Sequence, residues 1–151
     1  MARKPYDDDQ LIKALAENML LVLPYFRKKT FHMDSVKERF GLSLSQVQII
    51  AMLEQIGKMS VSSISERMGI AKPNVTPLVE SLSKSGYVLR RRDESDHRAV
   101  NVYVTPSGKE VLESVREYLA GEVSDWSKEF SRQEVKTLSE SFAGIAKVLG
   151  K

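Results

Sequence analysis

The chain has 151 residues, of which 42% are hydrophobic and 28% charged, and its formal net charge is +3. These proportions are typical of a folded globular protein and exclude a disordered or collagen-like chain. Cysteine is absent, which excludes disulfides and thiolate metal sites. No apolar run reaches the roughly 18 residues that span a bilayer, and the N-terminus has no apolar signal core. We therefore expect a cytoplasmic protein without a membrane partner.

Basic residues concentrate in the middle of the chain. Residues 57–109 contain 9 Lys or Arg against 5 acidic residues, a net charge of +4, whereas the remainder contains 14 against 15, a net charge of −1. A local excess of this kind is typical of a surface that contacts phosphates. The alternative reading is an ordinary solvated face.

The first predicted helix spans residues 7–29. Its apolar positions recur at the helical spacings of 3 and 4: Ile12, Leu15, Met19, Val22 and Phe26. Pro24 cannot donate a hydrogen bond to the carbonyl of Leu20, so we expect a kink or break there. A shorter helix is expected around residues 34–40, ended by Gly41.

The third helix has a strong start signal. Ser43 is placed to cap it, and Gln46, three residues later, is placed to complete a capping box. The helix is predicted to run to about Gln55, with Gly57 ending it.

Two further helices form a predicted helix-turn-helix. Ser60 caps a helix over residues 61–68, and a turn over residues 69–72 leads to a second helix over residues 73–84. The second helix has one apolar face, made by Val75, Leu78, Val79 and Leu82. In this motif the second helix enters the DNA major groove with its other, polar face.

A basic β-hairpin is predicted directly after the helix-turn-helix. A strand with three consecutive arginines leads to a charged tip, and the returning strand alternates Val100, Val102 and Val104 with polar or aromatic residues. Thr105 and Pro106 then read as the cap and first residue of a helix. A hairpin that carries cations outward is typical of the wing of a winged helix.

Since neighbours on a strand point to opposite faces, at most two of the arginines can face the same phosphates. Another would pair with Asp93 or Glu94 or reach a ligand pocket.

Two C-terminal helices complete the chain. The first starts at Thr105, with an apolar side formed by Val111, Leu112, Val115, Leu119, Val123 and Trp126. The second has a capping box of Ser131 and Glu134. Its apolar positions again step by 3 and 4: Val135, Leu138, Phe142, Ile145 and Leu149.

The predicted architecture is a single domain over residues 1–151, mostly α with a small β-hairpin. Residues 43–107 form a winged helix-turn-helix lobe, and residues 7–42 and 108–151 form a helical dimerisation region. One small lobe cannot cover both apolar seams of the terminal helices, so we expect a homodimer. A two-fold dimer would place its recognition helices about 34 Å apart, one turn of DNA, on a pseudo-palindromic operator. The alternative is a monomer in which these helices complete the core.

The chain resembles the MarR/SlyA family of winged helix-turn-helix transcriptional regulators. The resemblance is carried mainly by Asp96-x-Arg98 followed by Val100, Val102, Val104-Thr105 and Gly108, with Leu42-Ser43 and Gln46 and the segment Lys72-Pro73-Asn74-Val75-Thr76 in support. It implies a homodimeric, sequence-specific binder of double-stranded DNA, commonly a repressor, that a small anionic or aromatic effector releases.

The resemblance and the two predicted motifs together give the candidate DNA-binding residues. On the recognition helix these are Lys72, Pro73, Asn74, Thr76, Ser81 and Lys84. On the wing they are Arg90, Arg91, Arg92, Asp96 and Arg98, of which Arg98 resembles the family's minor-groove arginine and Asp96 its orienting partner. Pro77 stands where the family frequently has arginine, so we expect the wing to carry a large share of binding.

The family's effector region suggests a candidate ligand site near Tyr25, Phe26, Phe31, His32, Met33 and Met52, with an arginine supplying charge. The alternative is that these are plain core residues. The two histidines, His32 and His97, lie far apart in the sequence, which argues against a metal sensor. No cofactor is expected.

Two other classes of function are alternatives to the regulator. An enzyme would need a nucleophile with its base, or paired carboxylates in a cleft, and no nucleophile elbow or phosphate-binding loop appears. A winged-helix protein-interaction module without sequence-specific DNA binding is the more serious alternative. It predicts weak, nonsaturating DNA binding.

Overall fold

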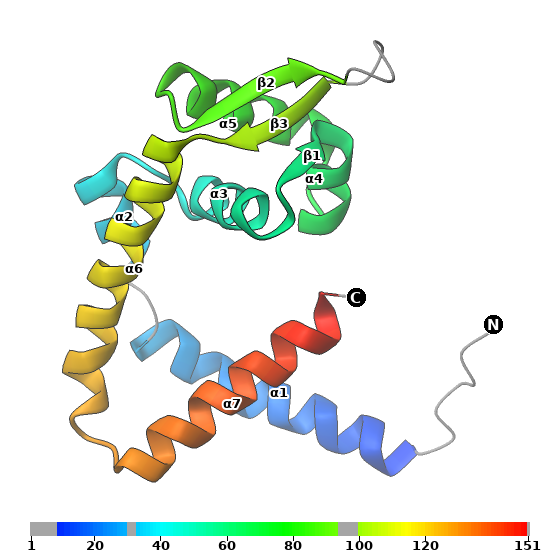
Figure 1. Ribbon diagram of the computed structural model, residues 1–151. Helices are drawn as coiled ribbons and strands as arrows, with labels where there is room; N and C mark the ends of the chain where they lie inside the picture. The colour runs from blue at the N-terminus through cyan, green and yellow to red at the C-terminus, as the bar shows by residue number, and fades with distance from the viewer. Residues whose placement is uncertain (1–8, 30–32, 94–99, 151) are drawn as a thin grey trace. The chain divides into compact units, whose positions relative to one another are not determined.

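The computed structural model describes residues 9–29, 33–93 and 100–150, without the side chains at 26–29, 33, 34 and 126 (Figure 1). The chain divides into two compact units, Met1–His32 and Met33–Lys151. Each unit is described by itself below.

The first unit contains one long helix, α1 (Asp9–Lys29). Of the expected kink or break at Pro24, the break is wrong, because the helix continues through this residue to Lys29, and the kink stays a prediction. A proline deprives a helix of one hydrogen bond and crowds one carbonyl, and the residues on either side remain helical. Several apolar side chains of α1 are exposed, including Leu15 and Met19, each at 60%.

The second unit holds the remaining helices and strands in the predicted order. They are α2 (Met33–Phe40), α3 (Leu44–Ile56), β1 (Lys58–Ser60), α4 (Val61–Met68), α5 (Lys72–Lys84), β2 (Val88–Arg92), β3 (Val100–Val104), α6 (Pro106–Ser127) and α7 (Arg132–Leu149). Both capping boxes predicted from the sequence are present, at Ser43 with Gln46 and at Ser131 with Glu134. The Ser131 hydroxyl and then the Ser131 backbone N–H donate hydrogen bonds to the Glu134 carboxylate, and both bonds lower its pKa. The mostly helical fold with a small β-hairpin is thus confirmed.

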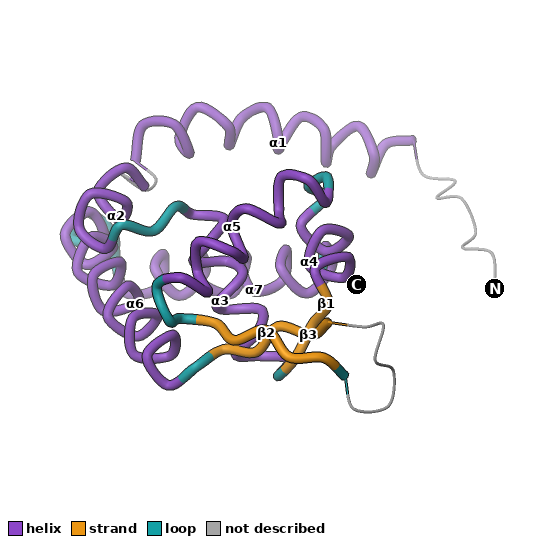
Figure 2. The backbone as a smooth tube through the Cα atoms, turned by 90° about the horizontal axis from the view of Figure 1, so that it is seen from above, coloured by secondary structure: helices purple, strands orange, loops and turns teal. Residues whose placement is uncertain are grey.

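The hairpin belongs to a three-stranded antiparallel sheet of order β1-β3-β2. Val102 in β3 lies opposite Met59 on one side and Arg90 on the other. The short segment before α4 was expected only to be extended, and its pairing with β3 was not predicted. The sheet lies along α3, α4 and α5 (Figures 1 and 2).

The core of this unit joins the helix-turn-helix to the sheet. Most of its fully buried side chains come from α3, α4, α5 and β3, among them Ile50, Ile64, Val79 and Val102. Each such side chain contributes about 1.5–3 kcal/mol when it leaves water. The same residues that form the apolar face of α5 therefore fix which of its faces remains outside.

The C-terminal helices are less buried than expected. In α6, Leu112 and Val115 are buried, whereas Leu119 and Val123 are half-buried. In α7, Phe142 is 45% exposed and Ile145 53%. A single chain therefore leaves the apolar seam of α7 largely in contact with solvent. Among the described residues, no helix is long and apolar enough to cross a membrane.

Candidate nucleic-acid interface

The turn of the helix-turn-helix is held by hydrogen bonds that the sequence did not predict. Gly69 ends α4 with a left-handed φ of 63°, a conformation that glycine adopts without strain. The Ser65 hydroxyl donates to the carbonyl of Ile70 at 2.6 Å, and the Ile70 N–H donates back to the Ser65 carbonyl at 3.2 Å. Together these contacts fix the turn that leads into α5.

The recognition helix α5 buries its apolar face and exposes the polar face that was predicted to contact DNA. Val75, Val79 and Leu82 are inaccessible to solvent. The side chains of Lys72, Pro73, Asn74, Ser81 and Lys84 are exposed, and Thr76 is half-buried. Pro77 lies inside α5 without interrupting it. The helix therefore presents a continuous polar face to solvent.

Two of the predicted contact residues also make contacts inside the lobe. The Thr76 hydroxyl donates to the carbonyl of Lys72, one turn earlier, at 3.0 Å, which leaves its methyl group and one lone pair available. The Ser81 hydroxyl accepts a hydrogen bond from Nε2 of Gln46 at 3.1 Å. Ser81 therefore links α5 to α3 in addition to its place on the exposed face.

Gln46 was predicted only as a cap, but the structure gives it a second role. Its Oε1 accepts from the backbone N–H of Ser43 at 2.9 Å while its Nε2 reaches Ser81. The side chain is 8% exposed and is the buried polar residue of the described core. One amide group thus caps α3 and sets the position of α5 against it.

Gln46→Leu is expected to destabilise the lobe by about 2 kcal/mol, because it removes a cap and a hydrogen bond between helices, each worth about 1 kcal/mol. Ser43→Ala removes the cap hydroxyl alone and should cost about half as much. Urea denaturation of Gln46→Leu, Ser81→Ala and the double variant measures the link directly. Strict additivity of the two single effects would show that Gln46 and Ser81 are not coupled.

The three wing arginines are exposed on both faces of the hairpin. By register Arg90 and Arg92 share a face with Val88, whereas Arg91 shares the other face with Leu89. None of the three forms an ion pair with another described residue, so their charges are available to a ligand. Asp96 and Arg98 lie outside the described residues.

Asp93 binds residues of the other two strands. Its Oδ2 accepts from Nζ of Lys58 at 3.1 Å and from Nδ2 of Asn101 at 2.7 Å. Lys58 precedes the helix-turn-helix in the chain and carried no sequence signal for this contact. The expectation that one of the three arginines pairs with Asp93 or Glu94 stays a prediction, since Glu94 lies outside the described residues.

The start of α6 is fastened to the turn before the wing. The Thr105 hydroxyl donates to the carbonyl of Gly86 at 2.6 Å and accepts from the N–H of Gly108 at 3.0 Å. The Thr105 N–H donates to the carbonyl of Tyr87 at 3.0 Å. A side chain at position 108 would not fit, because its Cβ would lie 2.1 Å from the Tyr87 carbonyl oxygen.

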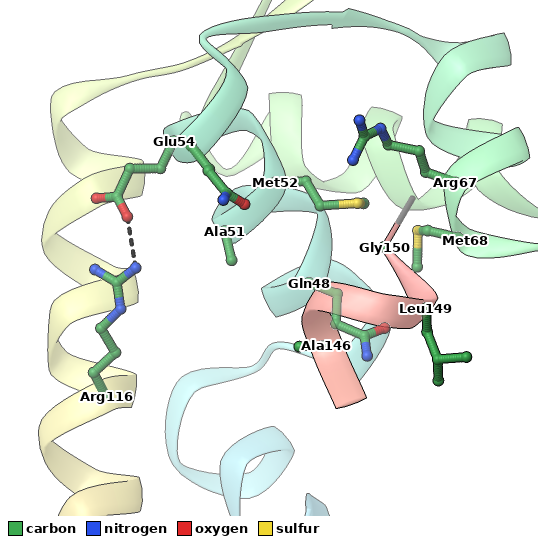
Figure 3. A pocket seen from close by; sticks show the side chains of 11 residues that line it. Gln48, Ala51, Met52, Glu54, Arg67, Met68, Arg116, Ala146, Leu149 and Gly150 are labelled. Carbon is green, nitrogen blue, oxygen red and sulfur yellow. Dashed lines mark hydrogen bonds and ion pairs between the residues drawn. The ribbon is translucent and has the colours of Figure 1, made fainter. Parts of the chain in front are cut away.

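An open pocket of about 840 Å³ lies among α3, α4, α6 and the end of α7 (Figure 3). Met52 and Met68 line it together with two arginines. Arg116 donates to Glu54 at 2.6 Å and to Glu113 at 3.3 Å. The bond to Glu54, followed by that to Glu113, raises the pKa of the guanidinium. Arg67 lines the same pocket and makes no ion pair with another described residue.

This pocket contains one of the predicted effector residues, Met52. Tyr25 lies on α1 in the other unit, where it is 68% exposed. The Phe26 side chain, His32 and Phe31 fall outside the described parts. The contributions of Arg67 and Arg116 were missed, because they become neighbours of Met52 only through the packing of helices distant in sequence.

Comparisons with known proteins agree with this fold. The MarR family model matches residues 42–100. The uncharacterized HTH-type transcriptional regulator YfiV of Bacillus subtilis is 34% identical over 79 residues, which cover 52% of this chain and 49% of YfiV, so the match spans about half the length of that relative. The uncharacterized HTH-type regulator YcgE of the same organism is 27% identical over 120 residues, covering 80% of this chain and 77% of YcgE.

A solved structure of similar fold is that of a MarR family protein from Bacillus stearothermophilus, with a TM-score of 0.74 and 20% identity over 92% of this chain and 97% of that one. The segment that the MarR family model matches begins at Leu42, next to the cap of α3. It extends through the helix-turn-helix to Val100 in the wing. Residues 42–100 of the chain are therefore similar to the MarR family, and the two relatives above carry the name of HTH-type transcriptional regulators.

Proposed function

We propose that this protein is a sequence-specific double-stranded DNA-binding regulator, acting as a repressor. The observation that carries the proposal is an exposed polar face on α5 beside exposed arginines on the neighbouring hairpin, which form no ion pair with another residue that the structure describes. Both belong to the segment that holds the chain's excess of positive charge. A helix for the major groove beside a cationic hairpin for the backbone is the arrangement that winged-helix DNA binding requires.

Base reading is assigned to the first turns of α5. The Asn74 side chain is exposed and can pair in bidentate fashion with adenine, and the Thr76 methyl group can contact the thymine methyl. Lys72 and Lys84 stand at the two ends of the helix, where they would contact phosphates. Such contacts fix the protein on the duplex without reading its sequence.

The wing is assigned the remaining contacts. Arg90, Arg91 and Arg92 supply phosphate contacts, while Arg98, oriented by Asp96, enters a narrow minor groove, which attracts cations by its enhanced negative potential. Because Pro77 leaves the recognition helix without a cation in its middle, the wing provides a large part of the affinity.

The proposed regulator acts as a homodimer. The support is the exposed apolar seam of α7 and the exposed apolar side chains of α1, since exposed apolar faces of this length mark protein interfaces. Two copies related by a two-fold axis would bind a pseudo-palindromic operator.

Light scattering of the purified protein is expected to give twice the chain mass of 17.0 kDa at micromolar concentration. Ile145→Glu, which places a charge on the seam of α7, should lower the mass toward that of one chain because burying an unpaired charge is costly. Lys147→Glu, on the opposite side of α7, is the matched control and should remain dimeric. A wild-type mass of 17.0 kDa would contradict the dimer.

A small anionic or aromatic effector is proposed to bind the pocket beside Met52. Arg67 would supply positive charge, because the charge of Arg116 is balanced by Glu54 and Glu113. Met52 and Met68 would form an adaptable apolar wall. Binding would favour a spacing of recognition helices that no longer matches the operator, and so shift the population away from the DNA-bound state.

Selection of bound duplexes from a random library by the wild-type protein tests the function. The expected result is an enriched inverted repeat with half-site centres about 10 base pairs apart, or a multiple of that spacing. Weak, nonsaturating binding without enrichment would overturn the proposal and favour a protein-interaction role. A reporter gene placed behind the selected site then distinguishes repression from activation.

A further inference from the structure

Three parts of the sheet meet at one carboxylate oxygen. Oδ2 of Asp93, just beyond β2, accepts hydrogen bonds from Nδ2 of Asn101 in β3 and from Nζ of Lys58 in β1. We call these three residues the Asp93 bridge. The Asp93 side chain is 16% exposed and that of Lys58 55%, so the acid is the enclosed partner.

The register shows what the bridge adds to the sheet. β1 pairs with β3 alone, through Lys58 to Ser60 against Tyr103 to Asn101, and β2 also pairs with β3 alone. The backbone hydrogen bonds of the sheet therefore do not connect β2 to β1 directly. A two-stranded hairpin is at best marginally stable in water, and the bridge connects the far end of β2 to the strand that precedes the helix-turn-helix.

The charge of Asp93 makes this placement informative. The residue follows three arginines on a hairpin proposed to contact phosphates, where a carboxylate repels DNA and lowers nonspecific affinity. Its contribution to binding must therefore come from geometry, and its pairing with Lys58 holds one further cation close to the wing.

We infer that Asp93 is a positioning residue for DNA recognition: through Lys58 and Asn101 it fixes the angle at which the wing leaves the helix-turn-helix. This assignment rests on the proposed DNA-binding function. If Asp93 acted only by its charge, removing it would strengthen binding to every duplex. The assignment predicts instead that its removal weakens the specific complex and strengthens, or leaves unchanged, the nonspecific one.

The test measures the affinities of Asp93→Ala for the selected operator and for an unrelated duplex of equal length, in the same salt. The ratio of the two affinities is expected to fall about tenfold, the effect of losing one charge-assisted hydrogen bond. Glu66→Ala is the matched control, since it removes an exposed acid of α4 in the same lobe. It should raise both affinities slightly and leave their ratio unchanged.

The double variant Asp93→Asn with Asn101→Asp exchanges the acid and the amide across the hairpin at constant net charge. It keeps a carboxylate beside an amide and within reach of Lys58, so the operator preference should return to within about twofold of wild type, a difference of less than one hydrogen bond. Thermal unfolding of every variant separates loss of positioning from loss of fold, because the Asp93→Ala lobe should remain folded at the assay temperature.

An unchanged ratio in Asp93→Ala, or an exchange variant as poor as Asn101→Asp alone, would overturn the assignment while leaving the proposed function intact. A wild-type protein that selects no DNA sequence would overturn the proposed function and this assignment together. The two failures are therefore distinguished by the wild-type arm of the same experiment.

Discussion

Gly108→Ala is expected to destabilise the protein by about 2 kcal/mol or more, although alanine is the better helix former by about 1 kcal/mol. The added Cβ would lie 2.1 Å from the Tyr87 carbonyl oxygen and 2.9 Å from Cγ2 of Val104. The Tyr87 oxygen is backbone and also accepts the Thr105 N–H, so the clash cannot be relieved by turning a side chain. Moving α6 away would break the hydrogen bonds that fasten its first turn.

Thermal unfolding followed by circular dichroism measures this effect. For a protein of this size the loss corresponds to a fall in Tm of about 5–8 °C. Gly121→Ala is the matched control in the same helix, because outside the helix's own backbone no described atom lies within 4 Å of its added Cβ. It should gain about 0.5–1 kcal/mol from helix propensity. A Gly108→Ala protein as stable as Gly121→Ala would contradict the close packing of α6 on the wing base.

Arg98→Ala is expected to lower affinity for the selected operator by about tenfold or more, with a smaller loss on unrelated DNA, because a groove contact depends on the shape of the site. Arg91→Ala should lower both affinities by the same factor, since phosphate contacts carry no sequence information. It should also reduce the slope of log affinity against log salt by about 0.9 for the one phosphate contact removed.

Fluorescence anisotropy with both duplexes over a range of salt concentrations distinguishes the two arginines. Arg132→Ala on α7 is the control, because it removes an exposed arginine outside the helix-turn-helix and wing. Equal losses of Arg98→Ala on both duplexes would contradict groove reading, and an unchanged salt slope in Arg91→Ala would contradict its phosphate contact.

Local signals in the sequence predicted most of the secondary structure. Cap residues such as Ser43 and Ser131 and the apolar spacing of α5 depend on neighbours within one or two turns, so they can be read directly from the chain. The same reasoning overestimated the effect of Pro24 on α1. The hydrogen bond that a proline removes does not by itself decide whether a long helix ends. The exposed seam of α7 was correctly identified as apolar, but its burial depends on a partner surface.

The contacts that shape the candidate site were not predictable in this way. Gln46 with Ser81 and Lys58 with Asp93 are each separated by 35 residues, and polar residues at such distances show no periodicity that links them. Arg67 and Arg116 likewise meet at one pocket only through helix packing. Which segments contact DNA stays a prediction from the sequence, whereas the contacts that hold those segments in place became visible only in the structure.

The fastening of α6 at Thr105 has a consequence for operator spacing in the proposed dimer. A helix of 22 residues is about 33 Å long, so a rotation of about 6° at its first turn displaces its far end by about 3.4 Å, the rise of one base pair. The stiffness of three hydrogen bonds around Thr105 would then set the tolerance for half-site spacing. In mechanical terms α6 would act as a lever arm, and the rigidity of its first turn would determine which operator spacings the proposed dimer accepts.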